Sequence, residues 1–232
     1  MAADTAQDIA DLDNPFWSAL RSRHAHLAIG TDTVARYPAD HAPFLGVAHA
    51  EVEADATLAA LLAPGESVYL IGVAPRVHAG MTLDSHGDLV QMIRTEPMPV
   101  PDGPAIVPLG EAQRDDVLAL TALVYPHYFR ERTLALGRYF GIYRDGRLAA
   151  MAGERLATDR YQELSAICTH PDFLGRGYAR RLTAWLANDV LAAGRTPYLH
   201  VSPANARAKG LYEDMGFRLR SHVPFWSLRR DA

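Results

Sequence analysis

The amino-acid sequence predicts an α+β protein, with a mixed, mostly antiparallel sheet and flanking helices. Two short polar segments, 144–146 and 158–160, separate strand-like stretches and are typical of turns between antiparallel strands. Between residues 177 and 192, apolar side chains recur at helical spacing and a glycine follows, as at the end of an amphipathic helix. Hairpins followed by an amphipathic helix favour a layered sheet that carries helices on its faces.

The composition is that of an ordinary globular protein, and it limits the partners. The 232 residues are 49% apolar and 22% charged, and the formal net charge is -4. This acidic balance disfavours nucleic acid and anionic membranes as partners, and no apolar run is long enough to cross a bilayer. Residues 1–13 lack the basic and apolar regions of a secretory signal. We therefore expect a cytoplasmic protein, either a monomer or a homodimer.

Metal-binding residue types are present, but their spacing is not that of a metal site. The chain has one cysteine, Cys168, and ten histidines, none of which form an HExxH-type pair on a predicted helix. The sequence therefore predicts neither a disulfide framework nor a metal site.

A proline-rich stretch divides the chain. Residues 96–108 contain five prolines, which disfavour helix and remove backbone donors, so we interpret the stretch as a linker. It separates an N-terminal α/β unit, 1–95, from a C-terminal unit, 104–232. In the N-terminal unit we expect helices near 15–23 and 54–62 and strands near 27–36 and 68–73.

The C-terminal unit has a clearer pattern of elements. In chain order we expect a strand at 106–109, a helix at 111–125, strands at 140–143, 148–155 and 162–169, a helix at 177–192, a strand at 198–201, a helix at 205–215 and a last strand from 217.

A glycine-bearing loop precedes the helix at 177–192. It runs through Leu174, Gly175 and Arg176 to Gly177. Glycines let a backbone approach a ligand closely, and the first helical turn offers unpaired N–H groups and the positive end of the helix dipole. We interpret the loop as a pyrophosphate-binding site, and a plain turn is the alternative.

Three segments resemble the GCN5-related N-acetyltransferase (GNAT) family. The loop resembles the family's motif A, with Gly177 and Ala179 at the small positions and Leu174 where the family usually has Gln or Arg. Residues 205–217, NARAKGLYEDMGF, resemble motif B. Residues 163–169, ELSAICT, resemble the FR47-like branch, which includes the catalytic domain of glycine N-acyltransferases. An upstream domain occurs in that branch too. The alternation of strands and helices in the N-terminal unit also allows it to be a degenerate copy of the same fold.

The resemblance implies an acyl-CoA N-acyltransferase fold for 104–232, with acetyl-CoA or another short acyl-CoA as co-substrate. It also implies that the strand at 164–169 bulges and opens a V-shaped slot for the pantetheine arm. The cofactor-binding residues that it implies are Ile167, Cys168, Thr169, Leu174, Gly175, Arg176, Gly177, Tyr178, Ala179, Asn205, Arg207, Lys209 and Tyr212. Structural alternatives remain: Asn205 can cap a helix, and Arg176, Arg207 and Lys209 can be solvated charges. The side chain of Cys168 can be a small apolar group of a buried strand.

Acyl transfer to an amine needs a deprotonated amine, a polarised carbonyl and a proton for the departing thiolate. By resemblance, Tyr212 is the candidate general acid, and a core aromatic is the alternative. Glu163 matches a glutamate that serves as base in glycine N-acyltransferases, directly or through water. Glu154 is the second candidate base, because strand alternation places it among small apolar side chains, where a carboxylate holds a proton more readily.

The sequence thus predicts an acyl-CoA-dependent N-acyltransferase that acts in a ternary complex on a primary amine of a small molecule or amino acid. A protein N-terminus or lysine is the alternative acceptor. A non-catalytic acyl-CoA-binding sensor or scaffold is the alternative function.

Overall fold

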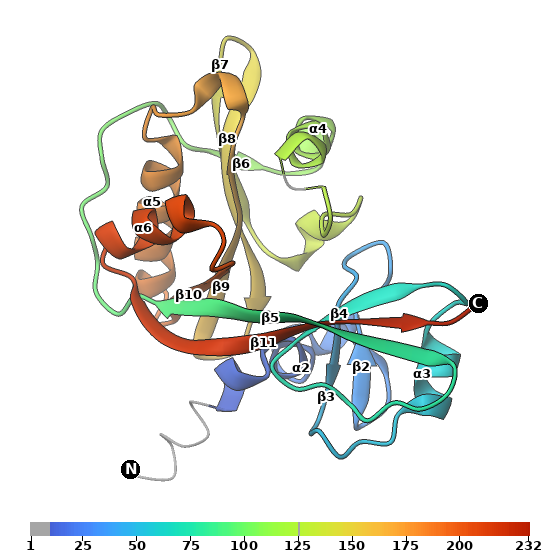
Figure 1. The fold of residues 1–232 in the computed structure, drawn as a ribbon. Helices are drawn as coiled ribbons and strands as arrows, with labels where there is room; N and C mark the ends of the chain where they lie inside the picture. The colour runs from blue at the N-terminus through green and yellow to red at the C-terminus, as the bar shows by residue number, and fades with distance from the viewer. Residues whose placement is uncertain (1–9, 125) are drawn as a thin grey trace.

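A computed structural model describes residues 10–124 and 126–232, which contain one large and one small sheet (Figure 1). The strands of the large sheet, from edge to edge, are β4 (Ser67–Ile71), β11 (Arg218–Arg230), β5 (Met81–Ile93), β10 (Thr196–Val201), β9 (Tyr161–Thr169), β8 (Arg147–Ala157), β7 (Tyr139–Arg144) and β6 (Val107–Leu109). All neighbours in this sheet are antiparallel except β9 and β10, which are parallel. The predicted α+β class, with a mostly antiparallel sheet and flanking helices, is confirmed.

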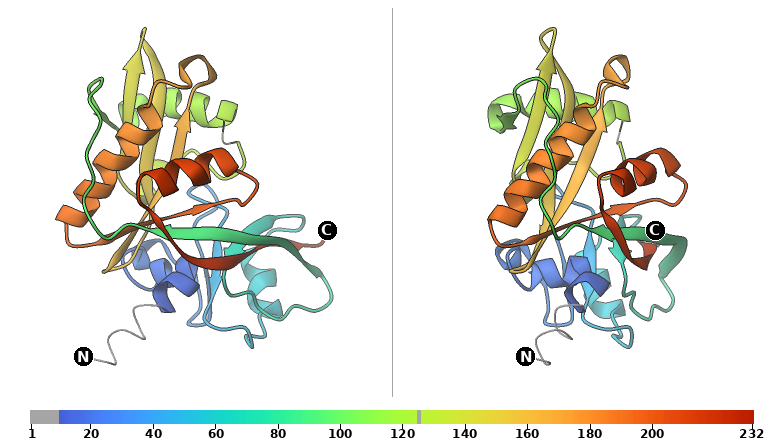
Figure 2. Two further views of the ribbon diagram at one scale, coloured as in Figure 1. Left: turned by 60° about the vertical axis from the view of Figure 1, so that its left-hand side comes forward. Right: turned by 90° about the vertical axis from the view of Figure 1, so that its left-hand side faces the viewer.

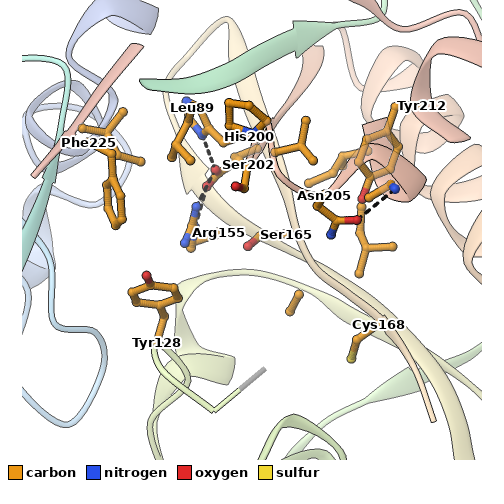
Figure 3. Close-up of a pocket in the computed structure, with 18 of the residues that line it drawn as sticks. Leu89, Tyr128, Arg155, Ser165, Cys168, His200, Ser202, Asn205, Tyr212 and Phe225 are labelled. Carbon is orange, nitrogen blue, oxygen red and sulfur yellow. Dashed lines mark hydrogen bonds and ion pairs between the residues drawn. The ribbon is translucent and has the colours of Figure 1, made fainter. Parts of the chain in front are cut away.

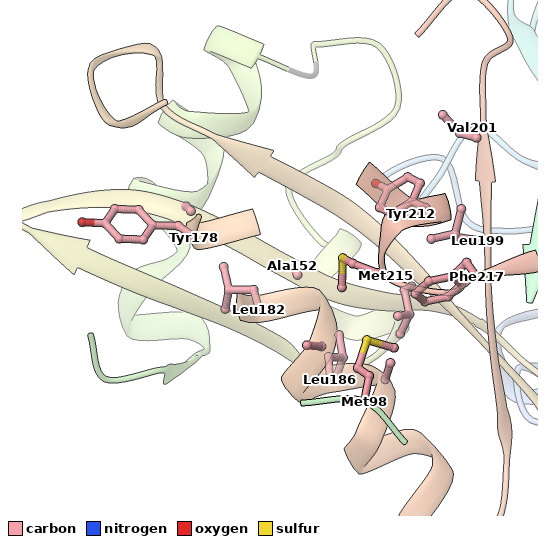
Figure 4. Packing of buried hydrophobic residues seen from close by; sticks show 14 of the residues in the cluster. Met98, Ala152, Tyr178, Leu182, Leu186, Leu199, Val201, Tyr212, Met215 and Phe217 are labelled. Carbon is pink, nitrogen blue, oxygen red and sulfur yellow. The ribbon is translucent and has the colours of Figure 1, made fainter. Parts of the chain in front are cut away.

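Helices cover both faces of the large sheet. Residues 10–13 are helical, and the α-helices that lie wholly within the described ranges are α2 (Pro15–Leu20), α3 (Asp55–Leu61), α4 (Arg114–Val124), α5 (Tyr178–Ala192) and α6 (Ala206–Asp214). On one face, Leu182 of α5 packs against Ala152 of β8 (Figure 4). On the other, Leu120 of α4 packs with Met151. Because consecutive residues of a strand point to opposite faces, α4 and α5 lie on opposite sides of the sheet.

The N-terminal part contributes a small sheet and two helices. The small sheet is formed by β1 (Ile29–Gly30), β2 (Val34–Arg36) and β3 (Leu45–Val47). Figures 1 and 2 show these elements, in blue, at the opposite end of the molecule from the β7–β8 turn. Phe16 and Phe44 share a buried cluster with Leu156 of β8 and Tyr198 of β10, so the N-terminal part packs directly on the large sheet.

Strands from both sides of the proline-rich stretch belong to the large sheet. The long strand β5 lies between β10 and β11, and β4 forms the edge beyond β11. Strand β4 corresponds to the strand expected near 68–73, whereas β5 was not among the expected strands. The division into two domains at 96–108 stays a prediction, and the parts on either side of it share this sheet.

The proline-rich stretch itself runs along α5. The backbone N–H of Met98 donates to the side chain of Asn188, whose amide donates back to the Met98 carbonyl over 2.7 Å. Arg181 also donates to the carbonyl of Pro104. The predicted linker is therefore attached to α5 by polar contacts, and Met98 is buried in the α5 core.

Most predicted helices and strands are present, with changed ends. The helix expected at 15–23 ends at Leu20, and the one expected at 111–125 begins with the 3-10 turn η2 (Glu111–Gln113); its last residue, 125, lies outside the described residues. The strand expected at 27–36 is instead a 3-10 turn, η1 (Ala25–Leu27), followed by a hairpin of β1 and β2. The hairpin forms because Thr31 donates its backbone N–H to the Val34 carbonyl, which reverses the chain.

Candidate active site

A bulge in β9 interrupts the large sheet near its centre. From Ser165 to Cys168, β9 has one residue more than β8 has opposite it, from Gly153 to Met151. Ala166, within the bulge, has φ of 50°, a left-handed conformation that side chains with a Cβ rarely adopt. Because a bulge bends its strand and interrupts the ladder, the backbone of this segment turns away from β8.

The strands β9 and β10 separate immediately before the bulge. They pair over Tyr161–Glu163 and Thr196–Tyr198, and both strands continue beyond that pairing. On its other side β10 pairs with β5 along its last four residues. The diverging edges of β9 and β10 form the slot that the resemblance implies, with main-chain groups along both sides.

Two cavities meet at this slot. One of about 710 Å³, here named the loop cavity, lies between the bulge, the glycine loop and α6. The other, of about 550 Å³ and named the sheet cavity, lies between β9, β10, the N-terminal part and the segment after α4. The residues that line both are Ile167, Cys168, Asn205, Ala208 and Tyr212. Figure 3 shows Tyr212, Asn205 and Cys168 at one end of the sheet cavity and Phe225 and Tyr128 at the other.

The loop cavity is built for an anion. Gly175 and Gly177 have φ of 77° and 75°, and a Cβ added to either would meet no atom within 4 Å, so open space lies in front of both. Gly177 is the N-cap of α5, whose first turn directs unpaired N–H groups outward. Arg176, Arg180 and Arg207 also line this cavity. Backbone donors, a helix N-terminus and guanidinium groups together suit a phosphate.

The structure places the predicted cofactor residues on the loop cavity, with one exception. Lys209 lines neither cavity, and its Nζ is 2.7 Å from Oε1 of Glu213, one turn further along α6. The i,i+4 spacing directs both side chains along the same exposed face of the helix. Asn205 lines both cavities and also caps α6, since its Oδ1 accepts from the N–H of Ala208.

Tyr212 lies at the junction of the two cavities. Its side chain is 6% exposed and packs against Phe217 in the core below α6. Helix α6 is held in place by the Asn205 cap and by the backbone bond from Phe217 N–H to the Tyr212 carbonyl. The ring therefore has a fixed position beside the slot.

Glu163 is a buried, fully engaged carboxylate in the sheet cavity. Its Oε2 accepts from Nε of Arg155 and its Oε1 from Nη2, both over 2.6 Å, and Nδ1 of His200 is 2.7 Å from Oε1. Burial alone would raise the pKa of Glu163. The charge and hydrogen bonds of Arg155, together with His200, hold the pKa instead at about 2. Glu163 is therefore an anion at neutral pH.

A hydrogen-bond chain fixes the tautomer of His200. Arg220 can only donate, so its contact with Gln91 identifies Oε1 of that amide as the acceptor. The Gln91 Nε2 donates to the Leu12 carbonyl and lies 2.9 Å from His200 Nε2. His200 Nε2 thus accepts, and its Nδ1 carries the proton that is donated to Glu163.

Glu154 occupies a different part of the molecule. It lines neither cavity, and its two oxygens accept from Nε and Nη2 of Arg138, at 3.0 and 2.5 Å. Arg138 also forms an ion pair with Asp189 of α5. The expectation of an apolar setting for Glu154 is wrong, because Arg138, directly opposite it just before β7, donates to both of its oxygens.

Cys168 lines both cavities, but burial raises the pKa of its thiol to about 12. A thiol of such high pKa is almost entirely protonated at neutral pH and is a poor nucleophile. Cys168 is half-buried, which agrees with the interpretation of its side chain as a small apolar group.

Sequence reasoning missed several polar residues of the sheet cavity. Arg155, His200 and Asp88 lie on three different strands, and no local motif connects them with Glu163. Strand alternation was a usable signal for His200, since Leu199 and Val201 on either side of it point into the α5 core. Asp88 had no such signal because its strand was not predicted.

Among residues 10–124 and 126–232, no group of three or more His, Cys, Asp or Glu residues is arranged to hold a metal ion. None of the helices in these ranges combines the length and hydropathy that a membrane crossing needs.

Comparisons with known proteins agree on the type of fold. The family described as FR47-like protein matches residues 139–226. A crystal structure from Novosphingobium aromaticivorans, assigned to the GNAT family of acetyltransferases, is 34% identical, with a TM-score of 0.86 over 95% of this chain and 99% of that one. No match is found among curated proteins.

Two more distant structures share the fold. A GCN5-related N-acetyltransferase from Kribbella flavida is 17% identical, with a TM-score of 0.60 over 93% of this chain and 92% of that one. A GCN5-related N-acetyltransferase-like protein from Streptococcus suis is 15% identical, with a TM-score of 0.56 over 98% and 99%. Both alignments include the N-terminal part, so its arrangement beside the C-terminal part recurs in these structures.

Proposed function

This chain belongs to the GCN5-related N-acetyltransferase (GNAT) family, in its FR47-like branch, and we propose that it transfers an acetyl group from acetyl-CoA to a primary amine of a small molecule. The observation that carries the proposal is the junction of the two cavities at Tyr212. An acyl thioester lying in the loop cavity would meet an amine lying in the sheet cavity beside this residue. Holding two reactants in contact supplies a large part of the rate of such a transfer.

The loop cavity fits the phosphates of coenzyme A. The N–H groups of the first turn of α5, with Gly175 and Gly177 leaving open space before them, would bind the pyrophosphate. Arg176, Arg180 and Arg207 would add charge-assisted hydrogen bonds. Leu174 adds no polar side-chain contact, but its backbone lies on the same wall.

The slot between β9 and β10 fits the extended arm that joins the phosphates to the sulfur. Ile167, Cys168 and Thr169 lie along the bulged edge and line the loop cavity. Backbone amides along this edge are suitable partners for the amide groups of the arm. The arm would end at the junction, beside Tyr212.

The reaction forms one bond and breaks another. The amine nitrogen attacks the thioester carbonyl carbon, the C–N bond forms, the C–S bond breaks, and the amine loses a proton while the departing thiolate gains one. Tyr212, which lines both cavities, is in position to donate that proton. Within the scheme, its hydroxyl is the general acid, and the proton that the amine nitrogen loses restores this hydroxyl, so that the protons balance over one turnover.

We assign Glu163 the role of a fixed anion instead of a direct base. A carboxyl group whose pKa is about 2 holds a proton poorly at neutral pH, and both of its oxygens already accept hydrogen bonds. Its charge fixes Arg155 and His200 in the wall of the sheet cavity. Glu154, which lines neither cavity, has no part in this scheme.

Release of free thiol tests the proposed function. The full chain is incubated with acetyl-CoA and a pool of small primary amines, and thiol release and acetylated products are both measured. We expect amine-dependent release together with a product that carries one added acetyl group. If acetyl-CoA binds, as measured by calorimetry, while no amine in a broad pool is acetylated, the chain is a non-catalytic binding module and the proposal is wrong.

A further inference from the structure

The two cavities differ in the sign of the charges that line them. Among the described residues, the loop cavity is lined by three arginines and one carboxylate, Asp214. The sheet cavity is lined by one arginine, Arg155, and two carboxylates, Glu163 and Asp88. Arg155 and Glu163 neutralise each other as an ion pair, so Asp88 leaves the sheet cavity with a negative charge that attracts cations, whereas the excess of arginines gives the loop cavity a positive charge that attracts anions. The acceptor side of the junction favours an ammonium compound.

The arginine of the sheet cavity is already paired with a carboxylate of the protein. Arg155 donates two hydrogen bonds of 2.6 Å to Glu163, and its guanidinium carbon lies 5.0 Å from the ring centroid of Phe44. In a bidentate ion pair of this kind, the protein's own carboxylate neutralises the positive charge of the guanidinium. A carboxylate on the acceptor would have to displace Glu163 from Arg155, in a cavity that Asp88 also lines.

Aromatic rings form the end of the sheet cavity that is remote from Tyr212. Tyr128 and Phe225 lie with their centroids 6.2 Å apart and their planes at 76°, and Phe44 lies 6.3 Å from Tyr128. Behind them, Tyr69 stacks on Phe225 and meets Tyr128 edge to face at 4.9 Å. Edge-to-face and offset contacts of this kind form a rigid surface against which another ring packs well.

These rings come from separate parts of the chain. Phe44 belongs to the N-terminal part, Phe225 to β11, and Tyr128 to the segment after α4. Figure 3 shows Phe225 and Tyr128 across the cavity from Tyr212 and Asn205, with Arg155 between the two ends. An acceptor whose amine reaches the Tyr212 end therefore places the rest of its structure among the rings.

Asp88 adds a negative charge close to this end. It lies on β5 directly opposite Pro224 of β11, the residue before Phe225, and it lines the cavity. Its carboxylate attracts an ammonium compound as it enters and repels a compound that carries a carboxylate.

From these observations we infer that the acceptor is a primary amine with an aromatic body and no carboxylate group, and that free amino acids are poor acceptors. The inference rests on the proposed function and narrows its acceptor class from small amines in general to arylalkylamines. Three features support the inference: the charge contrast between the cavities, the ion pair of Arg155 with Glu163, and the aromatic end opposite Tyr212.

Three amines test the inference. With acetyl-CoA fixed, kcat/KM is measured for phenethylamine, for free phenylalanine, which differs by its carboxylate, and for butylamine, which lacks the ring. We expect phenethylamine to exceed phenylalanine by at least about tenfold and butylamine by about three- to tenfold. The amino group of phenylalanine has the lower pKa, so a larger fraction of phenylalanine than of phenethylamine is unprotonated at a given pH. A higher kcat/KM for phenethylamine therefore cannot result from a larger fraction of free amine.

Two charge-reversal variants test whether Asp88 causes the preference for phenethylamine over phenylalanine. Asp88→Lys is compared with Asp84→Lys, which changes an equally exposed aspartate of the same strand that lines neither cavity. We expect Asp88→Lys to reduce the preference for phenethylamine over phenylalanine by at least about fivefold, and Asp84→Lys to change it by less than about twofold. Equal effects of the two variants would overturn the role of Asp88.

The outcomes separate the inference from the function on which it rests. If phenylalanine is acetylated as well as phenethylamine or better, the inference is wrong and the proposed function stands. If acetyl-CoA binds but none of the three amines and no amine of the broad pool reacts, the proposed function fails, and the inference fails with it.

Discussion

Glu163 of β9 accepts a hydrogen bond over 2.7 Å from Nδ1 of His200 on β10, at the place where the two strands begin to separate. Arg155 binds the same carboxylate from β8, so three neighbouring strands meet at one buried anion. His200 in turn is oriented by Gln91 of β5. The centre of the sheet is thus joined by polar side chains as well as by its backbone ladder.

The first prediction concerns stability in acid. Glu163 has a pKa of about 2 in the folded protein, against an ordinary value of 4.5. A lowered pKa in the folded state adds stability above the unfolded pKa, and this stability is lost as pH falls through the folded pKa. At neutral pH we expect Glu163→Gln to lower the free energy of unfolding by about 3 kcal/mol, because Arg155 loses its buried partner.

Chemical denaturation over a pH series measures this effect. The gap between the wild-type protein and Glu163→Gln should stay constant above about pH 4.5 and narrow as pH falls towards about 2. Glu213→Gln, which removes only the exposed pair with Lys209, serves as control and should cost under about 0.5 kcal/mol. A gap that remains constant through the acid range would contradict the ion-pair account.

The second prediction separates the two candidate bases. If Glu163 is a fixed anion, kcat/KM should rise between about pH 6 and pH 9 as the acceptor amine loses its proton, in the wild-type enzyme and in Glu163→Gln alike. Glu154→Gln should keep its activity within about twofold at neutral pH, since Glu154 lines neither cavity. A rising limb that disappears only in Glu163→Gln would show that Glu163 is a base after all.

The residues of the loop cavity could be predicted from the sequence because they belong to local, consecutive segments. The strand before the glycine loop, the loop itself and α5 are consecutive, and Asn205 caps the short helix that carries Tyr212. Patterns of this kind depend on helix periodicity and turn chemistry, which are visible in a single segment. The bulge at Ala166 was predicted by resemblance alone, since no residue type in the segment requires a left-handed backbone.

The third prediction concerns Tyr212. Replacing it with phenylalanine should lower kcat by about 100-fold or more, because the departing thiolate loses its proton donor. Affinity for acetyl-CoA, measured by calorimetry, should change by less than about fivefold. Tyr143→Phe is the matched control: its hydroxyl binds Asp116 and it lines neither cavity, so kcat should be unchanged. Unchanged turnover of Tyr212→Phe across the pH range would exclude it as general acid.

The fourth prediction concerns the glycine loop. Gly177 and Gly146 have φ of 75° and 73°, and a Cβ on either would meet open space. An alanine at either position should therefore cost about 1 kcal/mol of stability through the backbone alone. The two sites differ in that only Gly177 lines the loop cavity. We expect Gly177→Ala to weaken acetyl-CoA binding by at least about tenfold, and Gly146→Ala to leave it unchanged.

Calorimetry of both variants, with their thermal stabilities, tests this prediction. Equal loss of acetyl-CoA affinity in the two variants would indicate a general effect of destabilisation and not a phosphate contact at the start of α5.

The lining of the sheet cavity could not be predicted because it depends on how distant strands align. Strand β5 carries Asp84, His86, Gly87 and Asp88 in its exposed middle, so it lacks the alternation of a half-buried strand. It forms because β11 pairs along most of its length, and β10 pairs with its buried end. Tertiary pairing of this kind overrides local preference.

The contacts among Arg155, His200 and Glu163 could not be predicted either. These residues become neighbours only when β8, β9 and β10 adopt one particular register, which no single segment of the chain encodes. Glu154 is a similar case. Strand alternation predicted apolar neighbours for it but could not reveal that Arg138, opposite it beside the neighbouring strand, binds its carboxylate.

Direct transfer in a ternary complex is the central claim, and initial velocities over a grid of acetyl-CoA and amine concentrations test it most directly. Since the two cavities meet at Tyr212 and burial holds the pKa of Cys168 at about 12, both substrates should bind before any bond breaks. The account predicts double-reciprocal lines that intersect, and no acetylated protein when the amine is omitted. Parallel lines, together with a protein mass increased by one acetyl group on Cys168, would contradict it.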